Sequence, residues 1–325
     1  MTQPRLHVVV PDDHPPTYGG PKQADLARLA AHAQVTVHTT RATERGELFQ
    51  RLAPADAIIN VRAYTLLDDE AFSFAPRLKI VSILGTGTDN VDLGAASRRG
   101  IVVTNTPGVG APSVAELTIG LMLAVARSIP VSDVRLRQGE WQHDEGPELF
   151  GKTLGLLGLG AIGCRVAELG RCFGMRVIGW SWREDAARAQ RLGLTLVERD
   201  DVFRQADVVS LHLRSTPLTR GSVGRRELGL MRPTAMLLNT ARAAIVDQDA
   251  LVEALAERRI AGAGLDVYLE EPLPPQKNPF RGLDNVVLTP HIGAVTAEAA
   301  ARSRAMPVDN ILAWLAGKPQ HVVNL

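Results

Sequence analysis

Short apolar runs alternate with longer segments of mixed polarity along most of the 325-residue chain. Runs such as LHVVV, DAIINV and TLGLLGLG are continuously apolar, which is typical of parallel strands buried on both faces. The segments between them, such as CRVAELGRCFG, repeat apolar residues at helical spacing. This strand–helix alternation predicts an α/β fold made of doubly wound parallel sheets.

The pattern also divides the chain. An apolar segment from Ser113 to about Ile129 is predicted to form a long helix between the two halves, and the C-terminal segment AEAAARSRAMPVDNILAWLAG is again helical in pattern. Because single cores stop growing near about 250–300 residues, we expect two domains. The first would be discontinuous, with residues 1–104 and 295–325, and the second would take in residues 105–294.

Composition and charge argue against several classes of function. The 36 basic and 35 acidic residues nearly cancel, which gives no support for a nucleic-acid partner or an anionic membrane surface. The N-terminus lacks a secretory-signal pattern, and the longest apolar run carries Glu116 and is too short to span a bilayer. Cys164 and Cys172 have no histidine or cysteine neighbour at metal-ligand spacing. We therefore expect a cytoplasmic protein without a metal site or membrane contact.

Two phosphate-binding patterns stand almost back to back in GPELFGKTLGLLGLGAIG. The first, Gly146–Thr153, fits a P-loop, but a polar segment precedes it and a predicted strand follows it, which is the wrong context. Its loop also contains Pro147, which has no amide hydrogen to offer a phosphate. We therefore interpret the P-loop match as accidental.

The second pattern, Gly158-x-Gly160-x-x-Gly163, has Ala161 and Ile162 at its variable positions and lies between a predicted strand and a predicted helix. In that context the glycines permit a tight turn, close approach of a pyrophosphate and close packing of helix on strand. The helix N-terminus then faces the phosphates. The alternative is a tight turn without a ligand. We predict a dinucleotide site and two Rossmann-like or flavodoxin-like domains.

The choice between NAD and NADP depends on the end of the next strand, in MRVIGWSWRED. NAD sites usually place an acidic residue there to bond the ribose 2′-hydroxyl. This chain has Ser181 at that position, followed by Arg183, which could pair with a 2′-phosphate. We favour NADP, while Glu184 and Asp185 leave NAD open.

Three later segments, LLNTARAAIVD, AGLDVYLEEP and LTPHIGA, place reactive side chains at the ends of predicted strands, where open α/β sheets bind ligands. Together with ILGTGTDNVDL and NTPGVGAPSVAE, and in this order, they make the chain resemble the D-isomer-specific 2-hydroxyacid dehydrogenase family over nearly its whole length. The resemblance implies a substrate (catalytic) domain in the discontinuous part and a dinucleotide-binding Rossmann domain in residues 105–294.

The resemblance implies hydride transfer between NAD(P)H and a small 2-oxo acid or D-2-hydroxy acid, similar to a glyoxylate or hydroxypyruvate reductase. Arg242 would bind the substrate carboxylate and polarise its carbonyl, because a guanidinium binds a carboxylate bidentately and keeps its charge. His291 would be the acid–base, and Glu271 would hydrogen-bond it and fix its tautomer. Singly, each could be an ordinary surface or strand-end residue. Their joint occurrence in family order favours a catalytic set.

Further contacts are expected at both ligands. Asp266 would orient the nicotinamide amide, and the substrate carboxylate would meet the loop LGTG. The remaining predicted cofactor contacts are His212, Arg214, Thr240, Ala241, His291 and Gly293, and the predicted substrate contacts are Arg62, Leu84, Gly85, Thr86, Gly87 and Arg242.

The sequence departs from the family pattern at three places, with Ala243 where glycine is usual, Gly110 where asparagine is usual and Arg214 where proline is common. These departures leave open which 2-oxo acid and which cofactor are used. The resemblance also implies a homodimer, through the helix that begins near Ser113. A binding protein that responds to NAD(P) with little turnover, like the family's co-repressor relatives, is the alternative.

Overall fold

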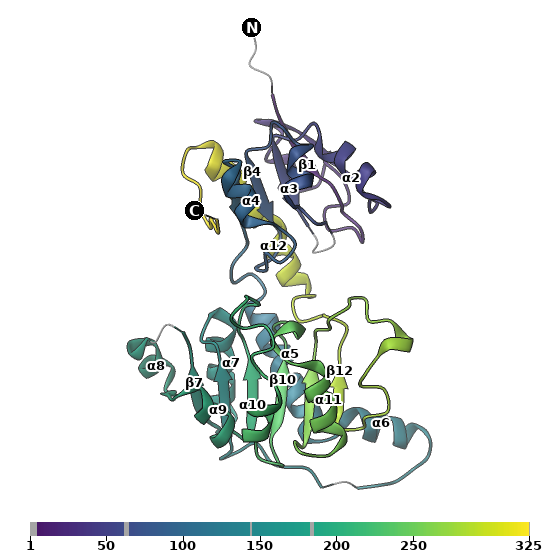
Figure 1. Ribbon diagram of the computed structural model, residues 1–325, viewed down its shortest axis with the longest axis vertical. Coiled ribbons are helices and arrows are strands. Elements are labelled where there is room, and N and C mark those ends of the chain that lie inside the picture. Colours follow the sequence, from purple (N-terminus) through teal and green to yellow (C-terminus); the bar gives the residue numbers. More distant parts are fainter. Residues whose placement is uncertain (1–4, 62–64, 144, 183–184, 325) are drawn as a thin grey trace. The chain divides into compact units, whose positions relative to one another are not determined.

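The computed structural model describes residues 5–61, 65–143, 145–182 and 185–324 (Figure 1). The chain divides into two compact units, the first reaching to Gly110 and resuming at Thr296, the second spanning Ala111–Val295. The sequence pattern predicts these breaks after residues 104 and 294. Each unit contains one parallel sheet, with five strands in the first and seven in the second among the described residues. The predicted α/β fold of two parallel-sheet domains is confirmed.

The first unit has the strand order β2-β1-β3-β4-β5. Alternate residues of its central strands face two apolar cores, and the terminal helix α12 returns to cover one of them with Val308 and Ile311. The strands are β1 Leu6–Val10, β2 Ala33–Val37, β3 Ala57–Asn60, β4 Ile80–Ile83 and β5 Val102–Thr104. The helices are α1 Ala24–Ala27, α2 Arg45–Leu52, α3 Asp69–Ser73, α4 Leu93–Arg98 and α12 Ala297–Leu315.

The segment KQADLARLAAHA has apolar residues at helical spacing, which predicts a helix over its whole length, but α1 ends at Ala27. After it the chain closes in tighter turns, because the amides of Leu29 and Ala30 bond to carbonyls three residues back. β2 begins at Ala33, so the chain has only a few residues in which to reverse direction. That close return to the sheet replaces the later turns of the predicted helix.

The second unit has the strand order β12-β11-β10-β9-β6-β7-β8, with every pairing parallel. The strands are β6 Thr153–Leu157, β7 Arg176–Trp180, β8 Thr195–Leu196, β9 Val208–Leu211, β10 Met236–Asn239, β11 Gly262–Leu265 and β12 Val286–Leu288. The helices are α5 Ala111–Ala126, α6 Ile129–Arg137, α7 Ala161–Cys172, α8 Ala186–Leu192, α9 Arg199–Gln205, α10 Arg225–Leu230 and α11 Gln248–Ala256, with 3₁₀ turns η1 Ala243–Ile245 and η2 Pro275–Lys277.

Helices cover both faces of this sheet, as a doubly wound fold requires. On one face, Leu154 and Leu156 of β6 pack in the same core as residues of α5 and α7. On the other face, Leu157 packs with residues of α9, α10 and α11. All five residues of β6 are buried, which explains why the strand is continuously apolar in sequence.

The long helix expected from Ser113 breaks into α5 and α6, which meet at an angle of 60°. The break is at Ser128, whose φ of 48° is left-handed and cannot continue a helix. Eight residues of α5 are buried, whereas none of α6 is. Among the described residues no single helix is long and apolar enough to cross a membrane, and only the bent α5–α6 pair has sufficient length and composition.

His212 follows β9 and lies where the strand meets the glycine-rich turn. Its Nε2 lies 2.9 Å from the Ser210 hydroxyl, and its buried Nδ1 has no hydrogen-bond partner in the part of the chain that the structure describes. Burial lowers the pKa of His212 to about 4. A charged imidazole is therefore disfavoured in the folded protein.

The lowered pKa of His212 predicts that the folded protein becomes less stable as the pH falls. In the unfolded chain the imidazole takes up a proton near its ordinary pKa of 6.5, but the folded chain does not until about pH 4. The neutral His212 therefore makes its full contribution to stability above about pH 6.5. This contribution is lost as the pH falls toward 4, which lowers the free energy of unfolding by up to about 3 kcal/mol. Urea unfolding of the intact protein between pH 7.5 and 4.5, followed by fluorescence, measures it.

The variant His212→Gln should unfold with a shallower dependence on pH over this window, because glutamine does not titrate. The exposed His143 offers a matched control, and His143→Gln should keep the slope of the unaltered protein. Equal slopes for His212→Gln and the unaltered protein would show that His212 is not the responsible group.

Candidate active site

The residues predicted to be catalytic follow the carboxyl ends of three adjacent strands in the second unit. Arg242 comes after β10, Glu271 after β11 and His291 after β12, and the sheet order places these strands side by side. Because the strands are parallel, their carboxyl ends lie along one edge of the sheet.

His291 and Glu271 form the central pair of the site. The Nδ1 atom of His291 lies 2.6 Å from Oε2 of Glu271, and both side chains are partly exposed, at 47% and 32%. The other carboxylate oxygen of Glu271 accepts a hydrogen bond of 2.9 Å from the amide of Tyr268. With Nδ1 occupied by the carboxylate, Nε2 is the ring atom left to exchange a proton with a ligand.

The surroundings of Glu271 keep it ionised. Partial burial alone would raise the pKa of Glu271, but the hydrogen bonds with His291 and the Tyr268 amide, and the charges of His291 and Arg242, lower it below its usual value. The carboxylate is therefore an acceptor, and it favours a proton on Nδ1.

Asp266 holds the turn that presents His291. This carboxylate is buried, with 1% of the residue exposed. One oxygen accepts hydrogen bonds from the Thr289 hydroxyl at 2.6 Å and the Ile292 amide at 2.8 Å, and the other accepts from the Gly293 amide at 2.9 Å. His291 sits between these anchors with a left-handed φ of 54°. Tying down the residues on both sides compensates for that unfavourable backbone conformation.

Two supporting residues were not identified from the sequence. Thr289 bonds Asp266 through its hydroxyl, and the hydroxyl of Tyr268 donates to the Thr289 carbonyl at 2.9 Å. Both lie inside the segments LTPHIGA and DVYLEEP, so their proximity to the predicted catalytic residues was the only available signal.

Arg242 stands at the start of η1 and is held through its own turn. Its Nη1 donates to the Ala241 carbonyl at 2.8 Å, and Asn239 bonds both the Arg242 carbonyl at 3.0 Å and the Ala241 amide at 3.1 Å. The hydroxyl of the neighbouring Thr240 lies 2.9 Å from that of Thr118 on α5. Arg242 is thus fixed at the same sheet edge as His291.

The glycine-rich turn lies between β6 and α7 and fits a dinucleotide. Gly158 has a φ of 100°, and its amide donates to the Trp180 carbonyl at 2.8 Å. A Cβ at Gly163 would lie 2.1 Å from the Gly158 carbonyl oxygen, so only glycine permits this packing of helix on turn. Gly160 has open space where a side chain would be, and no side chain caps α7. The turn therefore leaves room for phosphates before the amides of Ala161, Ile162 and Gly163.

Residues near the end of β7 bear on the choice of cofactor. Ser181 follows the strand, and the next acidic residue described, Asp185, caps α8 by accepting from the Arg188 amide at 2.8 Å. The predicted contact Arg183, with Glu184, lies outside the described residues, as does Arg62. Arg214 is exposed beyond His212.

The predicted substrate loop Leu84–Gly87 belongs to the first unit and follows β4. The amide of Leu84 donates to the Asn60 carbonyl at 2.8 Å, and the amide of Gly85 donates to the Thr106 hydroxyl at 2.8 Å. Thr86 bonds the Thr106 carbonyl through its own hydroxyl at 3.2 Å. Gly85 has a φ of 146°, which a side chain would not readily allow.

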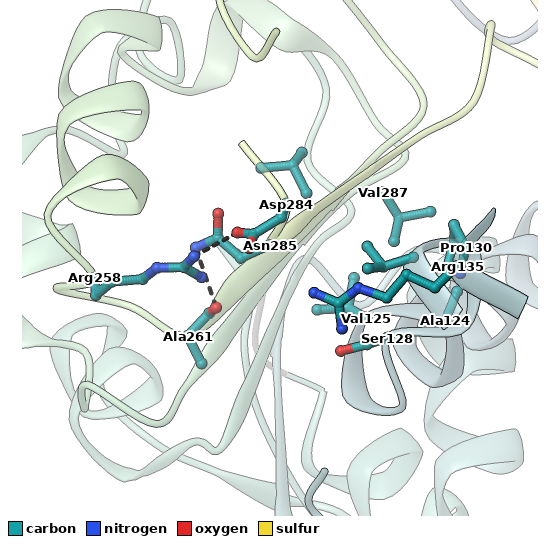
Figure 2. Close-up of a pocket in the computed structure, with 12 residues that line it drawn as sticks. Ala124, Val125, Ser128, Pro130, Arg135, Arg258, Ala261, Asp284, Asn285 and Val287 are labelled. Atoms are coloured by element: carbon teal, nitrogen blue, oxygen red, sulfur yellow. Dashed lines mark hydrogen bonds and ion pairs between the residues drawn. The ribbon is translucent and has the colours of Figure 1, made fainter. Parts of the chain in front are cut away.

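A separate hollow of about 160 Å³ lies at the opposite edge of the second sheet (Figure 2). Ala261 and Asn285 line it where β11 and β12 begin, and Ser128 and Arg135 line its other side. It is therefore not part of the site around His291. Among the described residues, no group of three or more histidines, cysteines and acidic residues could hold a metal ion.

Comparison with known proteins identifies the family of the chain. Residues 119–293 match the family profile described as D-isomer specific 2-hydroxyacid dehydrogenase, NAD binding domain. The chain is 44% identical to the glyoxylate reductase of Aeropyrum pernix, over 85% of either protein. It is 41% identical to the D-3-phosphoglycerate dehydrogenase of Methanocaldococcus jannaschii, over 86% of this chain but 53% of that protein, so it spans about half of that relative.

A solved structure of an acyclic imino acid reductase in complex with NADPH and D-Arg is also similar, with a TM-score of 0.88 at 30% identity. The similarity covers 98% of this chain and all of that one (100%). The profile match and the glyoxylate reductase confirm the resemblance seen in the motifs. The chain belongs to the D-isomer-specific 2-hydroxyacid dehydrogenase family.

Proposed function

We propose that the protein reduces a small 2-oxo acid to the D-2-hydroxy acid with NAD(P)H, or catalyses the reverse oxidation. The observation that carries this proposal is the 2.6 Å contact between His291 and Glu271, with Arg242 after the adjacent strand β10. These three groups supply the proton donor, its ionised partner and a carboxylate-binding cation. They lie in the same unit as the glycine-rich turn.

Arg242 binds the substrate carboxylate and polarises the adjacent carbonyl. A planar guanidinium offers two parallel hydrogen bonds to a carboxylate, which fixes the substrate's orientation as well as its position. The loop Leu84–Gly87 adds a second contact to the carboxylate in this proposal, through the amides of Thr86 and Gly87, since those of Leu84 and Gly85 bond within the first unit. Arg62 is a further substrate contact in this proposal.

His291 supplies the proton. In the direction of reduction, Nε2 of the imidazolium donates its proton to the carbonyl oxygen while the carbonyl carbon gains a hydride. Glu271 accepts from Nδ1–H throughout, so it fixes the tautomer and stabilises the positive ring before the transfer. In the oxidative direction the neutral ring takes the proton from the hydroxyl group.

The nicotinamide cofactor, when bound, supplies or accepts the hydride. Gly158, Gly160, Ala161, Ile162 and Gly163 would hold its pyrophosphate. The other proposed contacts are Ser181, Arg183, His212, Arg214, Thr240, Ala241, Asp266, His291 and Gly293. We favour NADP, because Ser181 carries no charge to repel a 2′-phosphate and Asp185 is already engaged in capping α8. The similar imino acid reductase was solved with NADPH.

A spectrophotometric assay tests the proposal directly. Purified protein is mixed with NADH or NADPH and each of a panel of 2-oxo acids, including glyoxylate, hydroxypyruvate, pyruvate and aromatic 2-oxo acids. Loss of the reduced-nicotinamide absorbance with one pair is the expected result. Tight cofactor binding without turnover on any acid would instead favour a NAD(P)-responsive binding protein.

Replacing His291 with alanine should lower turnover by about 10²–10⁴-fold, because the carbonyl oxygen loses its positioned proton donor. Binding of the reduced cofactor, followed by its fluorescence, should change little. His143→Ala alters an exposed histidine and should retain full turnover. Activity of His291→Ala within tenfold of the unaltered enzyme would contradict the assignment.

Replacing Arg242 with lysine should raise KM for the 2-oxo acid and lower kcat, together by roughly 10–100-fold in kcat/KM. The ammonium keeps the charge but loses the two parallel hydrogen bonds to the carboxylate. Steady-state kinetics at saturating cofactor measures the effect, with Arg220→Lys as the control at an exposed site. Unchanged kinetics in Arg242→Lys would exclude bidentate recognition.

We also propose a homodimer that buries α6. None of the residues of α6 is buried, although Ile129, Val134 and Leu136 are apolar and 51–57% exposed, and Trp141 just beyond is 81% exposed. An apolar surface of this kind is typical of a protein–protein interface. The apolar residues that line the adjoining hollow extend this surface.

Light scattering should give twice the chain mass of 35.0 kDa. Leu136→Asp should shift the protein toward the monomer, because a charge would be buried at the interface without a partner. Leu218→Asp places the same charge at another exposed position, 77% exposed, and should leave the dimer intact. A monomeric unaltered protein would refute the homodimer.

A further inference from the structure

The side chain of Arg188 lies against the glycine-rich turn although it is distant from it in sequence. Arg188 is in the first turn of α8, and its Nη1 donates to the Leu159 carbonyl at 3.1 Å. Leu159 stands between Gly158 and Gly160, so the guanidinium lies beside the turn that fits a dinucleotide. The thiol of Cys164 bonds the same carbonyl at 3.3 Å.

We propose that Arg188 recognises the 2′-phosphate of an adenosine ribose and thereby gives the protein a preference for NADP. This inference rests on the proposed function, since it concerns the cofactor of the same site. In this fold the ribose lies near the end of β7, beside the glycine-rich turn. Arg188 stands on α8, the helix that follows β7, and its guanidinium donates to a carbonyl of that turn.

The state of Asp185 supports this preference. A carboxylate free to bond a ribose 2′-hydroxyl would favour NAD and repel a 2′-phosphate. In the structure Asp185 accepts from the Arg188 amide at 2.8 Å and pairs with the Arg188 Nε at 3.2 Å. It therefore serves α8 and orients the arginine. Ser181, where the strand ends, is neutral and can donate or accept a hydrogen bond.

The chemistry of Arg188 suits a phosphate. Its side chain is 44% exposed, so a ligand can reach it, while the contacts to Leu159 and Asp185 reduce its freedom before binding. These contacts use Nη1 and Nε, and Nη2 carries further donors for phosphate oxygens. A pre-positioned guanidinium loses less conformational entropy on binding than a free one.

The test uses nucleotide fragments, so it does not depend on turnover. Calorimetry measures Kd for 2′,5′-ADP and 5′-AMP, which differ only in the 2′-phosphate. The unaltered protein should bind 2′,5′-ADP roughly 10–100-fold more tightly, as expected for charge-assisted hydrogen bonds. Arg188→Ala should lose most of this preference while its Kd for 5′-AMP stays within about twofold. Arg188→Lys should be intermediate.

Arg191→Ala is the matched control, because it removes an exposed arginine from the same helix and should retain the preference. No preference in the unaltered protein, or an undiminished preference in Arg188→Ala, would overturn the proposal. Equal weakening of both fragments in Arg188→Ala would show a purely structural role and would also overturn it. If the protein shows any of these results and still turns over a 2-oxo acid with NADH, the proposal for Arg188 fails and the proposed function is retained.

Discussion

The buried carboxylate of Asp266 is the interaction on which the candidate site depends. It joins the end of β11 to the turn after β12 through three hydrogen bonds of 2.6–2.9 Å. Without those bonds, the left-handed backbone of His291 would lose the support on both sides that compensates for its conformation, and the ring would be held by Glu271 alone. Glu271 follows the same strand as Asp266, so one strand end supplies both the support of the turn and the partner of the ring.

A second constraint comes from the close packing at the glycine-rich turn. The Gly163 backbone lies so near the Gly158 carbonyl that no side chain fits, and a Cβ at Gly158 would lie 2.5 Å from the His212 carbonyl oxygen. The turn is therefore fixed between β6, β9 and α7. His212 is held neutral behind it by burial. A rigid turn keeps helix amides directed at one position without a rearrangement on binding.

Both constraints arise from parallel strands that end at a common edge of the sheet. Because the strand order is β12-β11-β10-β9-β6-β7-β8, Arg242, Glu271 and His291 follow one group of neighbours and the glycine-rich turn follows a central strand. The hollow lined by Ser128, Arg135, Ala261 and Asn285, at the other edge, contains none of these residues. The proposed catalytic residues and the proposed phosphate-binding turn are thus separated along one edge, while α5 and α6 carry the surface proposed for dimer contact.

Much of the fold and of the candidate site could be predicted from the sequence. Continuous apolar runs such as TLGLLGLG require burial on both faces, so the α/β class and the parallel sheets followed from local pattern. The motif order identified the family and its candidate residues.

Local pattern did not determine where helices end: α1 stops at Ala27 because the chain must return to β2, and α5 stops before Ser128, where the backbone turns left-handed. Nor did it reveal that Thr289 and Tyr268 support the turn that carries His291, or that Arg188 bonds the Leu159 carbonyl. Those contacts join residues about 20–30 positions apart, and only packing of the sheet and its helices brings them together.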